Sequence, residues 1–79
     1  MFQKINLIKG GDNLKRKNLI KFRIDMGYKS KDMADKLGIT FTKYSNLENG
    51  RVEPSLDFIY KFQEIFDVED VLELFRKLA

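Results

Sequence analysis

The sequence predicts an all-α fold in which five short helices form a compact bundle. Apolar residues recur at intervals of three and four along most of the chain, as they do on one face of a helix. Three of these stretches stop at a glycine, namely Gly27, Gly38 and Gly50. Because 79 residues can bury only a modest core, we expect one domain, residues 14–79, preceded by an arm at residues 1–13.

The arm shows no regular apolar pattern. Its four apolar residues between positions 2 and 8 fit the spacing of neither a strand nor a helix, and Gly10 and Gly11 interrupt whatever precedes them. We expect a flexible or loosely docked segment, with one short strand as the alternative.

The first expected helix spans about residues 14–26. Asp12 or Asn13 is suited to cap its start, and Gly27 follows its end. Its apolar stripe consists of Leu14, Leu19, Ile20, Phe22, Ile24 and Met26. We expect this stripe to face the core.

The next two expected helices, residues 30–37 and 41–49, are only three residues apart. Gly38 stops the earlier helix, and Thr40 is placed to cap the later one through its hydroxyl. Ala34 is small where two helices must cross closely. This short connection predicts a helix-turn-helix corner.

Two further helices are expected, one from Pro54 or Ser55 to residue 66 and one over residues 68–78. Apolar residues surround most of the earlier helix, so we expect it to be central and largely buried. The later helix carries a single apolar stripe. This stripe either completes the core of the monomer or forms a two-fold dimer interface, and Phe58 has the same two interpretations.

The composition argues against an enzyme. The chain has no cysteine and no histidine, which removes disulfides, the commonest zinc ligands and the usual general base. The carboxylates of Asp32, Asp35 and Glu48 show no pattern that would place two of them in a cleft. We therefore expect no catalytic residue, no metal and no cofactor. The N-terminus is too short and polar for a secretory signal, and no apolar run approaches membrane-spanning length.

Charge is distributed unevenly along the chain. Residues 1–51 contain twelve Lys and Arg against five Asp and Glu, a net charge of +7, whereas residues 52–79 contain three against seven, a net charge of −4. This asymmetry indicates that the first part of the domain faces a polyanion. The alternative is that the lysines only maintain solubility.

The third expected helix has two different faces. At 100° per residue, Tyr44 and Leu47 point inward. The outward residues are Thr42, Ser45 and Asn46. This outward face is polar and uncharged, whereas a helix face that only meets solvent would be dominated by Glu and Lys.

Such a face suits a helix that lies in the major groove of DNA. Asn46 can pair with adenine, Thr42 can contact a base edge or a thymine methyl, and Lys43 can reach guanine or a phosphate. Phe41, at the front of the helix, either covers thymine methyls or packs against the second helix as a boundary residue. The hydroxyl of Thr40 or the neighbouring N–H groups can meet a phosphate.

The chain resembles the phage-repressor (Cro-like) or xenobiotic-response-element helix-turn-helix family, whose fold is that of a lambda-repressor-like DNA-binding domain. The resemblance covers residues 14–75 and rests on Arg23, Gly27, MADKLGIT at 33–40, LENG at 47–50 and EPSL at 53–56. It implies a small helical domain that usually dimerises and binds a pseudopalindromic operator.

The resemblance also implies roles for individual residues. Base contacts are expected from Phe41, Thr42, Lys43 and Asn46. Phosphate contacts are expected from Lys29, Ser30, Thr40 and Arg51. Arg23 and Glu48 are expected to form an ion pair between the first and third helices, partly buried or, alternatively, exposed and weak. The chain departs from the family at Lys29, where a Thr or Ser cap is common, and at Asp67, where Gly is frequent.

The sequence therefore predicts a cytoplasmic, bacterial or phage-encoded transcriptional repressor that binds double-stranded DNA as a homodimer. The alternative is an antitoxin or adaptor that acts mainly through a protein partner, with the arm and the fifth helix as its binding surface. Steep salt dependence of duplex binding would favour the repressor, and tight protein binding at high salt would favour the alternative.

Overall fold

The structure, a computed structural model, describes residues 14–78, and these residues confirm the predicted all-α class. The helices are α1 (Lys17–Asp25), α2 (Ser30–Leu37), α3 (Phe41–Glu48), α4 (Leu56–Phe66) and α5 (Val71–Leu74). Within residues 14–78 the only β-type pairing is an isolated antiparallel bridge between Lys15 and Leu78. The expected arm, residues 1–13, lies outside the described residues.

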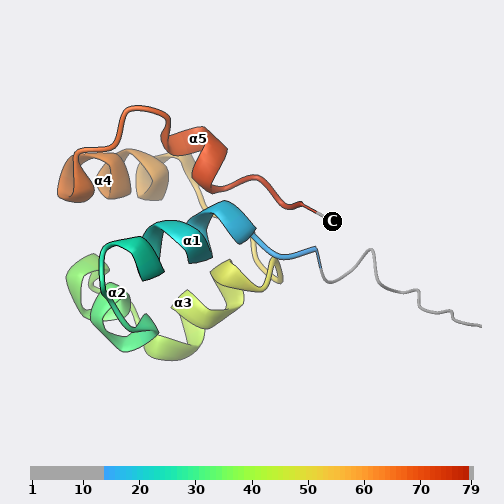
Figure 1. Cartoon of the computed structure of the whole chain (residues 1–79), viewed down its shortest axis with the longest axis horizontal. Coiled ribbons are helices and arrows are strands. Elements are labelled where there is room, and N and C mark those ends of the chain that lie inside the picture. The colour runs from blue at the N-terminus through green and yellow to red at the C-terminus, as the bar shows by residue number, and fades with distance from the viewer. Residues whose placement is uncertain (1–13, 79) are drawn as a thin grey trace, which may run out of the picture.

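The helices form two groups on either side of α1. Figure 1 shows α4 and α5 along one side of α1 and the α2–α3 corner along the other. Helix α1 packs against both α3 and α5, and α2 also packs against α4. This arrangement leaves α3 on the side of the molecule away from α4 and α5 (Figure 1).

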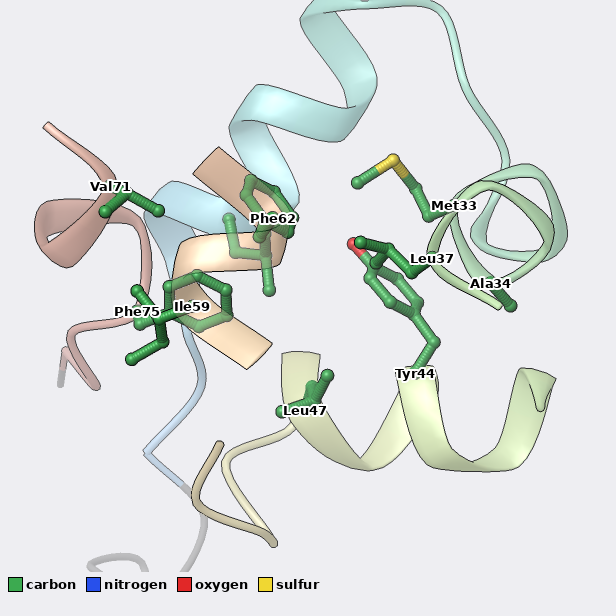
Figure 2. Close-up of a cluster of buried hydrophobic side chains, with 10 residues drawn as sticks. Met33, Ala34, Leu37, Tyr44, Leu47, Ile59, Phe62, Val71 and Phe75 are labelled. Atoms are coloured by element: carbon green, nitrogen blue, oxygen red, sulfur yellow. The ribbon is translucent and has the colours of Figure 1, made fainter. Parts of the chain in front are cut away.

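The core is built from residues of every helix. Its buried apolar members are Leu19, Met33, Ala34, Leu37, Tyr44, Leu47, Ile59, Phe62, Val71 and Phe75. Figure 2 shows the ring of Tyr44 directed from α3 toward Leu37 of α2, and Phe75 beside Ile59 of α4. The ring of Phe62 contacts Phe75 edge to face at a centroid distance of 5.2 Å, a favourable aromatic geometry. Val71 and Phe75 therefore complete the core of the monomer.

The first helix starts later than predicted. It begins at Lys17, with Arg16 at the N-cap position and no side-chain cap there, and the expected caps Asp12 and Asn13 lie outside the described residues. The residues just before it are held instead by tertiary hydrogen bonds: the amide of Leu78 donates to the carbonyl of Lys15 (2.9 Å), and the amide of Arg16 donates to the carbonyl of Glu48 (2.8 Å). Local sequence cannot reveal pairing with such distant segments.

The last helix is also shorter than predicted, since it ends at Leu74 rather than near residue 78. Asp67 adopts a left-handed conformation with φ of 53°, as expected for the residue that replaces the usual glycine. Beyond α5 the chain turns to the bridge with Lys15. The helix therefore ends because the tail pairs with Lys15, although the apolar spacing of the tail would allow further helical turns.

Helix α4 is less buried than predicted. Only Ile59 and Phe62 are buried, whereas Leu56, Tyr60 and Ile65 are exposed. The expectation of a largely buried helix was therefore wrong. The physical reason is that α5 is short and covers only part of the apolar surface of α4, which leaves these three side chains accessible.

Candidate nucleic-acid interface

The start of α3 is defined by its own cap. Gly38 ends α2 in a left-handed conformation, φ 70°, and Thr40 is extended. The amide of Lys43 donates to the hydroxyl oxygen of Thr40 at 3.1 Å, which satisfies one of the free N–H groups of the first turn. The predicted cap is confirmed. Because the hydroxyl accepts this bond through its oxygen, its own O–H is still able to donate to a phosphate, as are the remaining N–H groups of that turn.

The faces of α3 follow the helical-wheel prediction. Tyr44 and Leu47 are buried. Phe41, Thr42 and Lys43 are exposed, and Ser45 and Asn46 are half-buried. More than half of the surface of Phe41, 56%, is accessible, so this ring is not a boundary residue covered by α2. An aromatic ring, a hydroxyl and an ammonium group are therefore all presented on the first turn.

An ion pair holds α3 against α1. The Nε of Arg23 donates to Oε2 of Glu48 at 2.6 Å, and a longer contact joins Nη2 to Oε1. Both side chains are largely buried, so the alternative of an exposed, weak pair does not apply. The Glu48 hydrogen bond raises the pKa of Arg23 above its ordinary value. The pair fixes the angle of α3 because the two-pronged geometry restricts both side chains.

Tyr44 is a third member of this cluster that sequence analysis did not assign. Its hydroxyl donates to Oε2 of Glu48 at 2.7 Å in a buried position. Burial, together with the Glu48 hydrogen bond and charge, raises the pKa of Tyr44 well above its ordinary value. The i, i+4 spacing of Tyr44 and Glu48 on one helix was the available signal.

The most buried charged residue of the described range, Arg16, was also missed. Its side chain is 1% exposed. The guanidinium donates to the carbonyl oxygens of Phe75 (2.8 Å), Leu47 (2.7 Å) and Val52 (2.9 Å), and to a carboxylate oxygen of Glu53 at 3.0 Å. Its partners are 31 to 59 residues away in the chain, so no local pattern could have predicted the contact.

Arg16 acts as a C-terminal cap for α3. Leu47 lies in the last turn of that helix, where carbonyl oxygens lack intrahelical donors and the helix dipole favours a cation. The same guanidinium reaches the segment that follows α3 and the end of α5. Arg16 and Arg23 therefore attach α3 to the rest of the molecule at two points.

The chain after α3 closes in a Schellman motif. The amide of Gly50 donates to the carbonyl of Leu47 (3.2 Å), and the amide of Arg51 donates to that of Asn46 (2.9 Å). Gly50 has φ of 73°, and a Cβ at this position would overlap the carbonyl oxygen of Leu14. Glycine is required here for both reasons. Through this hydrogen bond to the Asn46 carbonyl, the motif fixes the main chain of exposed Arg51 relative to the end of α3.

The start of α2 carries two of the expected phosphate contacts. Lys29 is exposed and extended, and Ser30 is the first residue of the helix. As expected from its departure from the family, Lys29 provides no side-chain cap. The carboxylate of Asp32 compensates, since it accepts the amide of Lys29 at 2.8 Å. An acidic group at the third helical position is also favourable for the helix dipole.

The structure thus brings the predicted base-reading residues onto one short helix and places the predicted phosphate contacts at the ends of α2 and α3. Within residues 14–78 there is no group of three or more acidic, His or Cys side chains that could hold a metal. None of the helices in that range is long and apolar enough to cross a membrane.

The α2–α3 corner is that of a helix-turn-helix domain, a class of protein that binds double-stranded DNA. The chain belongs to the helix-turn-helix family of the Cro-like, or xenobiotic-response-element, type, whose family model matches residues 19–71. The resemblance seen in the sequence is confirmed. Nothing among the curated proteins or the solved structures matches the chain. Family membership makes the protein a DNA-binding transcription regulator, and the family is regulatory rather than enzymatic.

Proposed function

We propose that the protein is a transcriptional repressor that binds a pseudopalindromic operator as a homodimer, with α3 in the major groove. The observation that carries this proposal is the exposed first turn of α3 on a helix whose C-terminal end is anchored by Arg23 and Arg16. Base readout needs side chains whose positions are set before binding, because ordering them on the DNA would cost affinity.

The base-reading residues proposed are Phe41, Thr42, Lys43 and Asn46. Asn46 projects from the face opposite buried Tyr44 and can form the two hydrogen bonds that recognise adenine. The exposed ring of Phe41 can cover a thymine methyl.

The phosphate-contacting residues proposed are Lys29, Ser30, Thr40 and Arg51. These residues lie at the start of α2, the start of α3 and just after α3. Cations and free helix N–H groups at such positions fix the register of a protein on DNA without reading its sequence. Arg51 is the best placed of the cations because the Schellman motif fixes its main chain relative to Asn46.

The small size of the reading surface supports the proposed dimer. A helix of eight residues can read only a few base pairs, which is too little to single out one site in a genome. Two copies related by a two-fold axis would read two half-sites about 10 base pairs apart, or a multiple of this spacing. Repression is the simplest outcome, since a dimer bound over a promoter excludes the polymerase. The proposed location is the cytoplasm, where bacterial DNA lies.

The experiment that tests this proposal is selection from a pool of random duplex DNA, followed by sequencing of the retained fraction. A two-fold symmetric motif with half-sites about 10 base pairs apart is expected. Retention without any motif would show that the protein binds charge alone and would refute base readout by α3. If no duplex were retained even at low salt, the proposed DNA function would be wrong and a protein partner would have to be sought.

A further inference from the structure

The tail after α5 lies against the end of α3. The amide of Leu78 donates to the carbonyl of Lys15 at 2.9 Å, and the amide of Arg16 donates to that of Glu48 at 2.8 Å. These two bonds link the tail, through the segment before α1, to the last turn of α3. Figure 1 shows the tail ending near the loop that follows this helix. Residues from the far end of the chain therefore lie beside a proposed DNA-contacting region.

Lys77 is the residue of the tail that reaches this region. A Cβ at Gly50 would come within 3.0 Å of the side-chain Cδ of Lys77, so the lysine stem runs past the residue that precedes Arg51. The ammonium group then bonds to Oε2 of Glu53 at 2.5 Å. Lys77 thus lies between positions 50 and 53, beside the proposed phosphate contact Arg51.

The position of Lys77 also explains how an acidic residue is tolerated here. Glu53 is 68% exposed and only two residues from Arg51, so its carboxylate would repel a phosphate bound by Arg51. Cations engage both of its oxygens, since Nη2 of Arg16 bonds to Oε1 at 3.0 Å and Lys77 bonds to Oε2. With Arg51 included, three cations and one carboxylate give this cluster a net charge of +2.

The ammonium group of Lys77 can bind a phosphate without leaving Glu53. A lysine ammonium has three donors, and the bond to Glu53 uses one of them. The Lys77 side chain is 36% exposed, so the group is accessible. Its stem is packed against Gly50 and its end is held by Glu53, which reduces the entropy lost when a long side chain is ordered on DNA.

We propose that Lys77 is a further phosphate-contacting residue, which extends the DNA-binding surface from the helix-turn-helix to the C-terminal tail. Lys77 and Arg51 then neutralise neighbouring phosphates at the end of α3, and Glu53 is a positioning residue that holds the ammonium group there. This inference rests on the proposed DNA function. A contact of this kind adds affinity on every duplex and reads no bases.

The salt dependence of binding to a duplex of arbitrary sequence, about 20 base pairs long, tests the proposal. Lys77→Gln should reduce the slope of log affinity against log salt by about one unit, so its deficit in affinity at about 50 mM salt should shrink roughly three- to fourfold by about 200 mM. Lys77→Arg should keep the wild-type slope. The matched control is Arg76→Gln, which removes the same charge one position earlier, where the side chain pairs with Glu73 of α5. The control should leave the slope unchanged.

A second pair of variants separates a direct contact from a charge effect through Glu53. In protein that already carries Glu53→Gln, which keeps an acceptor for the ammonium group, Lys77→Gln should again reduce the slope by about one unit. No effect in that background would mean that Lys77 only neutralises Glu53, and the proposal would be wrong. Both side chains are exposed, so folding is preserved.

The same measurements distinguish failure of this contact from failure of the proposed function. If the wild-type protein bound the duplex with a steep slope and Lys77→Gln left that slope unchanged, the contact would be refuted and the proposed DNA function would stand. If the wild-type protein bound no duplex even at low salt, the proposed DNA function would be wrong, and the contact with it.

Discussion

The clearest structural prediction concerns Arg16, which joins three separate parts of the chain. Replacement by methionine, Arg16→Met, keeps an unbranched apolar stem but removes every donor of the guanidinium. The carbonyl oxygens of Phe75 and Val52 then lose the only donor seen for them within residues 14–78. The carbonyl of Leu47 keeps the amide of Gly50.

The cost can be worked from these contacts. A buried carbonyl left without a donor costs about 1–3 kcal/mol, which applies in full to Phe75; the Val52 carbonyl is only partly buried and costs less, so the two together cost about 2–5 kcal/mol. Removing a buried charge recovers part of its desolvation penalty, and exposed Glu53 keeps its ion pair with Lys77. We therefore expect a loss of about 2–4 kcal/mol in the free energy of unfolding, which for a domain of this size lowers Tm by about 10–25 °C.

Urea and thermal unfolding followed by circular dichroism measure this loss. The matched control is Arg76→Met, because Arg76 is 61% exposed and pairs only with a neighbouring surface glutamate in the described residues. The control should change the free energy of unfolding by less than about 0.5 kcal/mol. A loss below about 1 kcal/mol for Arg16→Met would refute the argument that the buried guanidinium stabilises the end of α3.

Four further predictions follow from the site. Glu48→Gln should lower the free energy of unfolding by about 2–4 kcal/mol, because it leaves a largely buried guanidinium without its anion; urea unfolding measures this, and an unchanged midpoint would show that the pair does not support α3. A lysine hydrogen bond holds the pKa of Glu53 below its ordinary value, so its ionised form stabilises the fold above about pH 4.5 and this contribution disappears as the pH falls through the lowered pKa. Glu53→Gln should accordingly be less stable than the wild type at pH 7 by about 0–1 kcal/mol and equally stable at pH 2–3, whereas a difference that persisted in acid would assign the effect to shape. On the selected operator, Asn46→Ala should cost about 1–3 kcal/mol at one base position and relax discrimination there; equal weakening on every duplex would assign Asn46 to the backbone. Arg51→Ala should weaken all duplexes alike and reduce the slope of log affinity against log salt by about one unit, with Arg76→Ala as the control; an unchanged slope would remove Arg51 from the phosphate contacts.

Most of the α2–α3 corner was predictable because its determinants are local. Thr40 caps the helix that it precedes, and Gly38 ends the one before it. The inward direction of Tyr44 and Leu47 followed from helical periodicity alone. The pairing of Arg23 with Glu48 came from the family resemblance, and the structure gives it a geometry.

The errors arose where distant segments compete with local preference. The spacing of residues 14–26 favours a helix from the start, yet Lys15 and Arg16 bond to Leu78 and Glu48 instead. The apolar stripe of residues 68–78 likewise suggested three turns of helix, but the tail pairs with Lys15 after Leu74. A tertiary hydrogen bond outweighs the small free energy by which one more helical residue is favoured.

The sequence by itself determined the helical class, the helix-turn-helix corner and the outward face of α3, because each depends on residues within a few positions of one another. Only the tertiary structure decided that Arg16 is buried, that Tyr44 shares the carboxylate of Glu48 with Arg23, and that α4 leaves Leu56 and Tyr60 exposed. Those outcomes depend on which surfaces remain uncovered after all the helices have packed, and no single stretch of the chain contains that information.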